Sequence, residues 1–159
     1  MSELVNKSTD QIVIFTLDEL FYALPMQSVV KVIESVEIHP LNQTPDLISG
    51  IINYKGRVIP VGDIRKRFGL PEHEIGPDDR IIIADTGKRE VAIVVDSVTG
   101  ITDLKQGQLE VSGTGPPLSE HITGVAKVKD DLVLIYDLDR FLSSDQEKQL
   151  DIALKKESE

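Results

Sequence analysis

The sequence predicts an all-β fold with a minor helical content, and three observations support this prediction. Short runs rich in β-branched residues recur along the chain, with turn residues between them. Dipeptides typical of tight hairpins separate several of these runs. A faint internal repeat relates the two halves of the chain, which predicts two similar β-barrel subdomains side by side.

Each expected strand is a short apolar run in which valine and isoleucine dominate. These runs are Ile12–Leu17, Phe21–Leu24, Val29–Val36, Gly50–Tyr54, Val58–Val61, Ile81–Asp85, Val91–Val95, Val125–Val128 and Leu132–Tyr136. The hairpin turns expected between neighbouring runs are Asp18-Glu19, Lys55-Gly56, Thr86-Gly87 and Asp130-Asp131.

Helices are expected at only a few places. Asp63 can cap a short helix that ends at Gly69, and Asp137 can cap a second short turn in the other half. Ser144 and Glu147 have the spacing of a capping box at the start of a C-terminal helix. The apolar stripe of that helix, which we expect to cover an open barrel end, consists of Leu142, Leu150, Ala153 and Leu154.

The internal repeat appears when Ile12–Val29 is aligned with Ile81–Val98 and Ile48–Ile64 with Ile122–Leu138. Chance similarity among β-branched strands is the alternative explanation. The repeat predicts one domain over residues 11–142, with subdomains at about 11–70 and 80–142 and a groove between them. Residues 1–10 are expected to be a flexible N-terminus, and residues 143–159 a helix and tail.

The composition argues against several functional classes. The chain has no cysteine, and its histidines, His39, His73 and His121, are isolated in the sequence, so we expect no metal site and no cofactor. A formal net charge of −10 disfavours nucleic acid and anionic membranes as partners. No apolar run is long enough to cross a bilayer, and no nucleophile elbow or phosphate-binding loop occurs, so we expect an intracellular protein that is not an enzyme.

One stretch stands out as basic in this acidic chain. It contains Lys55, Arg57, Arg65, Lys66 and Arg67. The stretch is either a solvated rim on a hairpin and a helical turn, or a surface that steers an acidic segment of a partner.

Residues 50–65, GIINYKGRVIPVGDIR, resemble the Gly-x-x-Asn-Leu-Arg-Gly-x-x-x-Pro-x-x-Asp-Leu signature of the CheW-like chemotaxis coupling proteins. Other segments resemble the family in order and spacing, so the similarity spans residues 11–142. These segments are Phe15–Leu17, Tyr22–Leu24, Ile93–Val98 and Leu132–Leu142.

The resemblance implies two five-stranded SH3-like barrels and a non-catalytic adaptor role in the cytoplasm. Such an adaptor couples the cytoplasmic tip of a chemoreceptor, a methyl-accepting chemotaxis protein, to the regulatory domain of a CheA-type histidine kinase in membrane-associated arrays. The partner-binding residues that the resemblance implies are Val29, Lys31, Gly50, Asn53, Lys55, Gly56, Arg57 and Val58.

Two positions depart from the family pattern together. Lys31 stands where the family usually has glutamate, and Lys55 stands where it usually has arginine. Because like charges repel, we expect an acid nearby, either Glu34 or Glu37 of this chain or an acid of the partner.

Two alternatives remain open from the sequence. An adaptor of the same fold could serve a kinase pathway unrelated to motility, which the two lysines favour. A small-ligand-binding β-barrel sensor is the other alternative. The aliphatic strands, however, predict filled barrel interiors, which disfavours the sensor.

Overall fold

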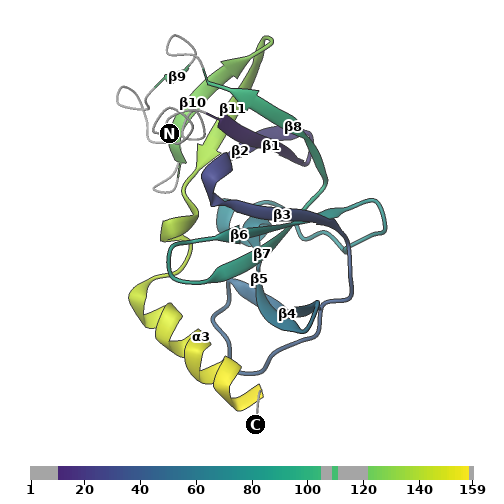
Figure 1. Cartoon of the computed structure of the whole chain (residues 1–159), viewed down its shortest axis with the longest axis vertical. Coiled ribbons are helices and arrows are strands. Elements are labelled where there is room, and N and C mark those ends of the chain that lie inside the picture. Colours follow the sequence, from purple (N-terminus) through teal and green to yellow (C-terminus); the bar gives the residue numbers. More distant parts are fainter. Residues whose placement is uncertain (1–10, 105–108, 111–121, 158–159) are drawn as a thin grey trace.

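The computed structural model describes residues 11–104, 109–110 and 122–157, and their strands form two sheets (Figure 1). Sheet A has the order β8-β1-β2-β11-β10-β9, and sheet B has the order β3-β6-β7-β5-β4. The strands of sheet A are β1 (Gln11–Leu17), β2 (Leu20–Pro25), β8 (Ser97–Asp103), β9 (Leu109–Glu110), β10 (Ile122–Val128) and β11 (Asp131–Tyr136). Those of sheet B are β3 (Val29–Glu34), β4 (Ile48–Tyr54), β5 (Arg57–Gly62), β6 (Arg80–Asp85) and β7 (Glu90–Val95).

The predicted all-β class with minor helix is confirmed, and every predicted run lies largely within a strand. The SH3-like architecture is also supported, although the hydrogen-bonded order of the described strands closes neither sheet into a complete barrel. Two strands, β8 and β9, were not predicted, because polar residues and Gly100 interrupt the apolar pattern of β8 and β9 has only two residues. The expected flexible N-terminus at 1–10, His121 and the last two residues lie outside the described residues.

Three hairpins share one turn geometry, in which both central residues are left-handed. The φ angles are 51° and 69° at Asp18-Glu19, and 51° and 84° at Lys55-Gly56. The third turn is Lys129-Asp130, with 49° and 71°, so the prediction of Asp130-Asp131 was wrong by one residue. Paired left-handed residues give the twist that two-residue hairpins require.

The helices begin where a side chain caps them. Asp63 accepts a hydrogen bond from the Lys66 N–H at 3.0 Å, and α2 (Ile64–Phe68) ends at left-handed Gly69, as predicted. A short 3₁₀ turn, Leu138–Arg140, is likewise capped by Asp137.

The C-terminal helix α3 (Ser144–Glu157) is capped one residue earlier than expected. Ser143 Oγ accepts from the Gln146 N–H at 3.2 Å, and Gln146 Oε1 accepts from the Ser143 N–H at 2.9 Å. Glu147 is instead paired with Arg89 at 2.8 Å, which attaches the helix to the β6–β7 hairpin region. Of the predicted stripe, Leu142 just before α3 and Leu150 and Leu154 within it pack in the largest core cluster, and Ala153 is also buried. Within the described residues, no helix has the length and hydropathy needed to span a bilayer.

Neither sheet is built from one half of the chain. The β1–β2 hairpin lies beside β11 in a parallel pair, and the β6–β7 hairpin lies beside β5 in the same way. One outer strand of each sheet also pairs with a strand from the other half of the chain: β3 pairs with β6, and β8 pairs with β1. The expected units 11–70 and 80–142 are therefore not the two sheets, since each half contributes strands to both.

The internal repeat has a clear structural counterpart in the cores of the sheets. Each sheet has its own cluster of six buried residues, and the two clusters correspond at offsets of 69 and 74 residues. They are Ile12, Ile14, Ala23, Ala126, Val133 and Ile135 in sheet A, and Ile81, Ile83, Ala92, Ile52, Ile59 and Val61 in sheet B. Register shifts also recur at equivalent places, at Ile48/Gly50 and at Ile122/Gly124.

A third cluster joins the two sheets and both α-helices. Its aromatic rings form a continuous series: Tyr22 stacks on Phe68 at 4.7 Å, and Phe68 meets the edge of Tyr136 at 4.9 Å. This shared core, together with α3, holds the two sheets in one folded body.

Candidate partner-binding site

Most of the predicted site residues lie at the tip of the β4–β5 hairpin. Asn53 Oδ1 accepts a hydrogen bond from the Gly56 N–H at 3.0 Å, which locks the turn from inside. Gly56 has a φ of 84°, and a Cβ placed on it would meet no atom within 4 Å. Asn53 and Gly56 therefore shape the tip, and Lys55, Arg57 and Val58 project from it with exposed side chains.

Gly50 lies at the other end of β4 and has a different role. A Cβ at this position would lie 2.4 Å from the His39 carbonyl oxygen. His39 and Ile51 exchange two backbone hydrogen bonds of 2.8 Å each, so the segment before β4 runs directly against the strand. The close backbone approach that glycine permits at position 50 is therefore made by the chain's own segment before β4.

Lys31 and Lys55 meet at Tyr54. The Lys31 Nζ lies 5.6 Å from the centroid of the Tyr54 ring, and the Lys55 Nζ lies 5.4 Å from it. β3 and β4 are the two outer strands of sheet B, so this contact joins the two edges of the sheet. We call the place where the two edges of a sheet approach each other its seam. A side-chain hydrogen bond with Tyr54 raises the pKa of Lys31, and the same hydrogen bond lowers the pKa of Tyr54.

No acid forms an ion pair with these lysines in the described part of the chain. None of the ion pairs there joins Glu34 or Glu37 to Lys31 or Lys55. Of the two alternatives, an acid from this chain is therefore not what these lysines contact, because both ammonium groups lie over the Tyr54 ring. An acid from the partner stays a prediction.

The remaining predicted residues differ in exposure. Val29 is half-buried and packs against the shared core, so part of its side chain is structural. Val58 is 53% exposed, and Arg57 forms an ion pair with Glu90 at 2.6 Å. The structure thus gathers Lys31, Asn53, Lys55, Gly56, Arg57 and Val58 around one hairpin, whereas Val29 and Gly50 lie apart from its tip.

The basic stretch does not form one surface. Arg65 is buried and donates to Asp18 at 2.8 Å and to Asp96 at 2.7 Å. Arg67 donates to the Arg140 carbonyl at 2.9 Å. Only Lys55, Arg57 and Lys66 remain candidates for steering a partner.

The Arg65 pairs were missed because nothing local in the sequence indicates them. Asp18 lies in the turn of the β1–β2 hairpin, and Asp96 lies between β7 and β8. Their separations from Arg65 are 47 and 31 residues, so only the chain path brings them together.

His73 belongs to the same polar cluster. Its Nε2 lies 3.1 Å from Asp79 Oδ2 and 4.0 Å from Asp96 Oδ1. Both carboxylates already accept other hydrogen bonds, from the Gly76 N–H and from Arg65. The cluster is therefore explained by the contacts that hold the Pro71–Asp79 connection in place.

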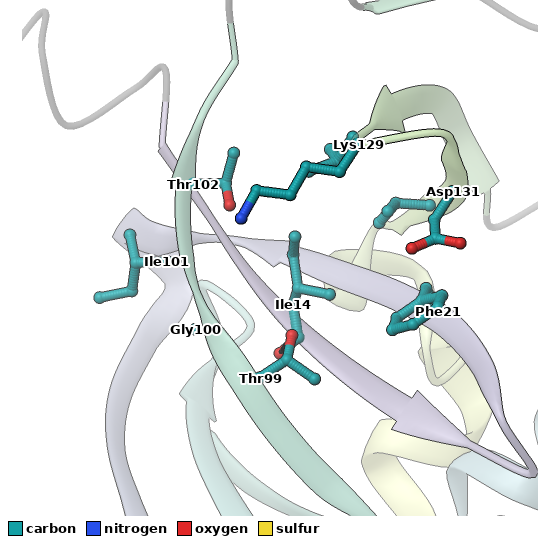
Figure 2. Close-up of a pocket in the computed structure, with 10 residues that line it drawn as sticks. Ile14, Phe21, Thr99, Gly100, Ile101, Thr102, Lys129 and Asp131 are labelled. Carbon is teal, nitrogen blue, oxygen red and sulfur yellow. Dashed lines mark hydrogen bonds between the residues drawn. The ribbon is translucent and has the colours of Figure 1, made fainter.

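Sheet A has a pocket of about 320 Å³. The pocket lies at the place equivalent to the one that Lys31 and Tyr54 occupy in sheet B. The equivalent residues are Gly100 and Val128, which leave this space unfilled. Figure 2 shows Lys129 and Asp131 on one side of the pocket, with Thr99 and Thr102 of β8 opposite them. The interior of sheet A is filled by its six-residue cluster, so this pocket is a partly open hollow at the edge of the sheet.

Comparisons with known proteins agree with this architecture. The family model described as the CheW-like domain matches residues 11–146. The chain is 28% identical over 132 residues to the chemotaxis protein CheW of Thermotoga maritima, covering 83% of this chain and 87% of that protein. It is 29% identical over 118 residues to the protein FrzA of Myxococcus xanthus, covering 71% of each.

A solved structure of a scaffolding protein is also similar to this chain. The crystal structure of the scaffolding protein TtCheW from Thermoanaerobacter tengcongensis matches with a TM-score of 0.78 at 30% identity, covering 87% of this chain and 95% of that chain. The family match spans most of the chain, and the fold agrees with that of the scaffolding protein. The protein is therefore a member of the CheW-like domain family.

Proposed function

We propose that this protein is a non-catalytic adaptor that couples the cytoplasmic tip of a chemoreceptor to the regulatory domain of a CheA-type histidine kinase. Membership of the CheW-like family over residues 11–146 is the observation that carries the proposal. The similarity to proteins named for chemotaxis and for scaffolding supports it. The adaptor acts in the cytoplasm and is recruited to receptor arrays at the membrane, without inserting into the bilayer and without a cofactor.

The proposed contact surface is the β4–β5 hairpin of sheet B with the adjoining strand β3. Val58 offers an exposed apolar side chain on the same hairpin as the charged groups of Lys55 and Arg57, and Lys31 of β3 adjoins this hairpin at Tyr54. Apolar and charged side chains together are common at protein interfaces. Asn53 and Gly56 hold the tip in shape, Val29 continues the surface along β3, and Gly50 keeps β4 in position.

Sedimentation of a three-way complex tests the adaptor role. Receptor signalling fragments and a CheA-type kinase are sedimented with and without the full chain, and kinase phosphorylation is measured in parallel. We expect the chain to co-sediment with both partners and to stimulate the kinase. If it does neither at micromolar concentration, the adaptor proposal is wrong.

The same assay tests the location of the site with a matched pair of variants. Val58→Glu places a charge at the proposed surface, and Leu132→Glu makes the same change at the equivalent hairpin of sheet A, where Leu132 is 63% exposed. We expect Val58→Glu to weaken the complex about tenfold or more, because an apolar contact is lost and a charge is buried. If Leu132→Glu weakens the complex equally, the β4–β5 hairpin is not the specific site.

A pathway unrelated to motility is a second candidate, favoured by the Lys31, Tyr54 and Lys55 cluster. Deleting the gene and tracking swimming in an attractant gradient distinguishes the chemotaxis role from a pathway unrelated to motility. Loss of gradient response supports the chemotaxis role, and normal swimming supports the other pathway.

A small-ligand sensor is the third candidate, favoured by the pocket of sheet A. Thermal unfolding across a panel of metabolites tests it. A ligand that raises the Tm of the wild type, but not of a Thr102→Phe variant that narrows the pocket, would support a sensor. The adaptor proposal expects no such ligand.

A further inference from the structure

A comparison of equivalent positions in the two sheets shows that sheet B differs from sheet A at Lys31 and Tyr54. Strand pairing places Lys31 opposite Ile83 in sheet B and Gly100 opposite Ile14 in sheet A, so these two positions are equivalent. By the same repeat, Tyr54 corresponds to Val128, and Lys55 corresponds to Lys129. Among the residues that the structure describes, only the seam of sheet B therefore has two ammonium groups and a phenol.

The two ammonium groups converge on one point of the surface. Both lie over the Tyr54 ring, at 5.6 and 5.4 Å from its centroid. Neither lysine belongs to any ion pair among the residues that the structure describes. Two neighbouring like charges repel, so an anion placed between them relieves that repulsion.

The surroundings of the cluster indicate what kind of anion fits. β3 exposes Val30 and Val32 next to Lys31, and Val58 is exposed on the same hairpin as Lys55. Lysine offers point charges, which attract a carboxylate and a phosphate alike, so the apolar surroundings have to choose between these anions. A carboxylate carried by a protein segment with apolar neighbours matches both the charges and the exposed valines.

We propose that Lys31, Tyr54 and Lys55 form a recognition site for a glutamate or aspartate side chain in an acidic segment of a protein partner. The carboxylate lies between the two ammonium groups and accepts a hydrogen bond from the Tyr54 hydroxyl. This inference rests on the proposed adaptor function, which supplies the identity of the partner. The site adds a criterion for which segments of that partner the hairpin binds.

Fluorescence anisotropy with the full chain tests the site without receptor or kinase. The probe is a labelled peptide in which glutamate alternates with leucine and alanine, and the key variant is Lys31→Glu/Lys55→Glu. We expect about tenfold weaker binding or more, chiefly through slower association, and wild-type binding that weakens as salt rises. The Lys31→Arg/Lys55→Arg variant, which keeps both charges, should retain binding.

The matched control is Lys127→Glu/Lys129→Glu, which makes the same change in net charge at the equivalent hairpin of sheet A. Lys127 and Lys129 are exposed, so this variant should fold and bind the peptide within about twofold of the wild type. Circular dichroism and thermal unfolding confirm that each variant is folded.

Three results would overturn the proposed site. They are no measurable binding of the peptide to the wild type, an equal loss in both double variants, or displacement of the peptide by inorganic phosphate as readily as by free acidic peptide. Because the assay contains neither partner, peptide binding without a three-way complex would leave the site standing and remove the adaptor function.

Discussion

Arg65 connects parts of the molecule that are far apart in the sequence. Arg65 is only 7% exposed, and its guanidinium pairs with Asp18 from the β1–β2 hairpin of sheet A and with Asp96 at the junction of the sheets. A buried guanidinium is stable only when its charge is matched by nearby acceptors. This one residue therefore couples the α2 helix to both sheets.

Removing this guanidinium should destabilise the fold. We expect Arg65→Ala to lower the free energy of unfolding by about 2–3 kcal/mol, less than for a fully buried pair because water reaches both carboxylates. Urea unfolding followed by circular dichroism measures the change. Lys66→Ala on the same helix is the control, and an equal effect of the two variants would contradict the role given to Arg65.

Asp96 should make the stability depend on acid pH. Burial raises the pKa of Asp96, but hydrogen bonds from Arg65 and from the Asp18 N–H outweigh it and hold the pKa below the ordinary value of 3.8. A carboxyl with a depressed folded-state pKa stabilises the fold above its unfolded pKa and loses that contribution as the pH falls through the folded value. The contribution is thus present near neutral pH and is lost below about pH 4.

The Asp96→Asn variant checks this dependence, because an amide does not titrate. Urea unfolding is compared at about pH 6 and about pH 3. We expect the wild type to lose more stability than the variant over this interval. Parallel losses would show that other carboxyls account for the acid sensitivity.

At the scale of elements, the two glycines of β4 and its hairpin differ in why they are needed. Gly56→Ala adds only the strain of a left-handed alanine, about 1 kcal/mol. Gly50→Ala forces a Cβ against the His39 backbone, so we expect about 2–3 kcal/mol and a displaced 38–39 segment. Chemical denaturation ranks the two variants, and an amide NMR shift at His39 in Gly50→Ala alone identifies the mechanism. The reverse order of stability would contradict this account.

Leu150 is the most deeply buried side chain of α3. Leu150 is fully buried in the shared core, while Ile152 on the same helix is 58% exposed. We expect Leu150→Ala to cost about 2–5 kcal/mol and Ile152→Ala less than about 0.5 kcal/mol. Thermal or urea unfolding gives both values, and similar losses would mean that α3 is not packed as described.

At the scale of the whole molecule, the exchange of hairpins between halves makes the two sheets interdependent. A fragment of residues 11–70 lacks β6 and β7, and a fragment of residues 80–142 lacks β1 and β2, so each sheet loses inner strands. We expect neither fragment alone to show cooperative unfolding by circular dichroism, whereas the two mixed should regain part of the fold. A separately folded fragment would show that the halves are autonomous.

The extent of sequence prediction follows the range of the interactions involved. Strands, left-handed turns and the Asp63 cap were predictable because each depends on residues within a few positions of one another. Two one-residue errors, at the Lys129-Asp130 turn and at the Ser143 cap, arose where neighbouring residues offered equally good local chemistry. In the candidate site, the hairpin tip could be predicted, but the contact between Lys31 and Tyr54 could not.

The sequence by itself determined the β class, the repeat and the local form of the hairpin that carries the proposed site. Only the tertiary structure decided that the halves exchange hairpins, that Arg65 is a buried link and that Lys31 and Lys55 meet at Tyr54. Local conformation is set by each residue's own steric and hydrogen-bonding preferences, whereas these contacts join distant residues and exist only once the chain path has closed them.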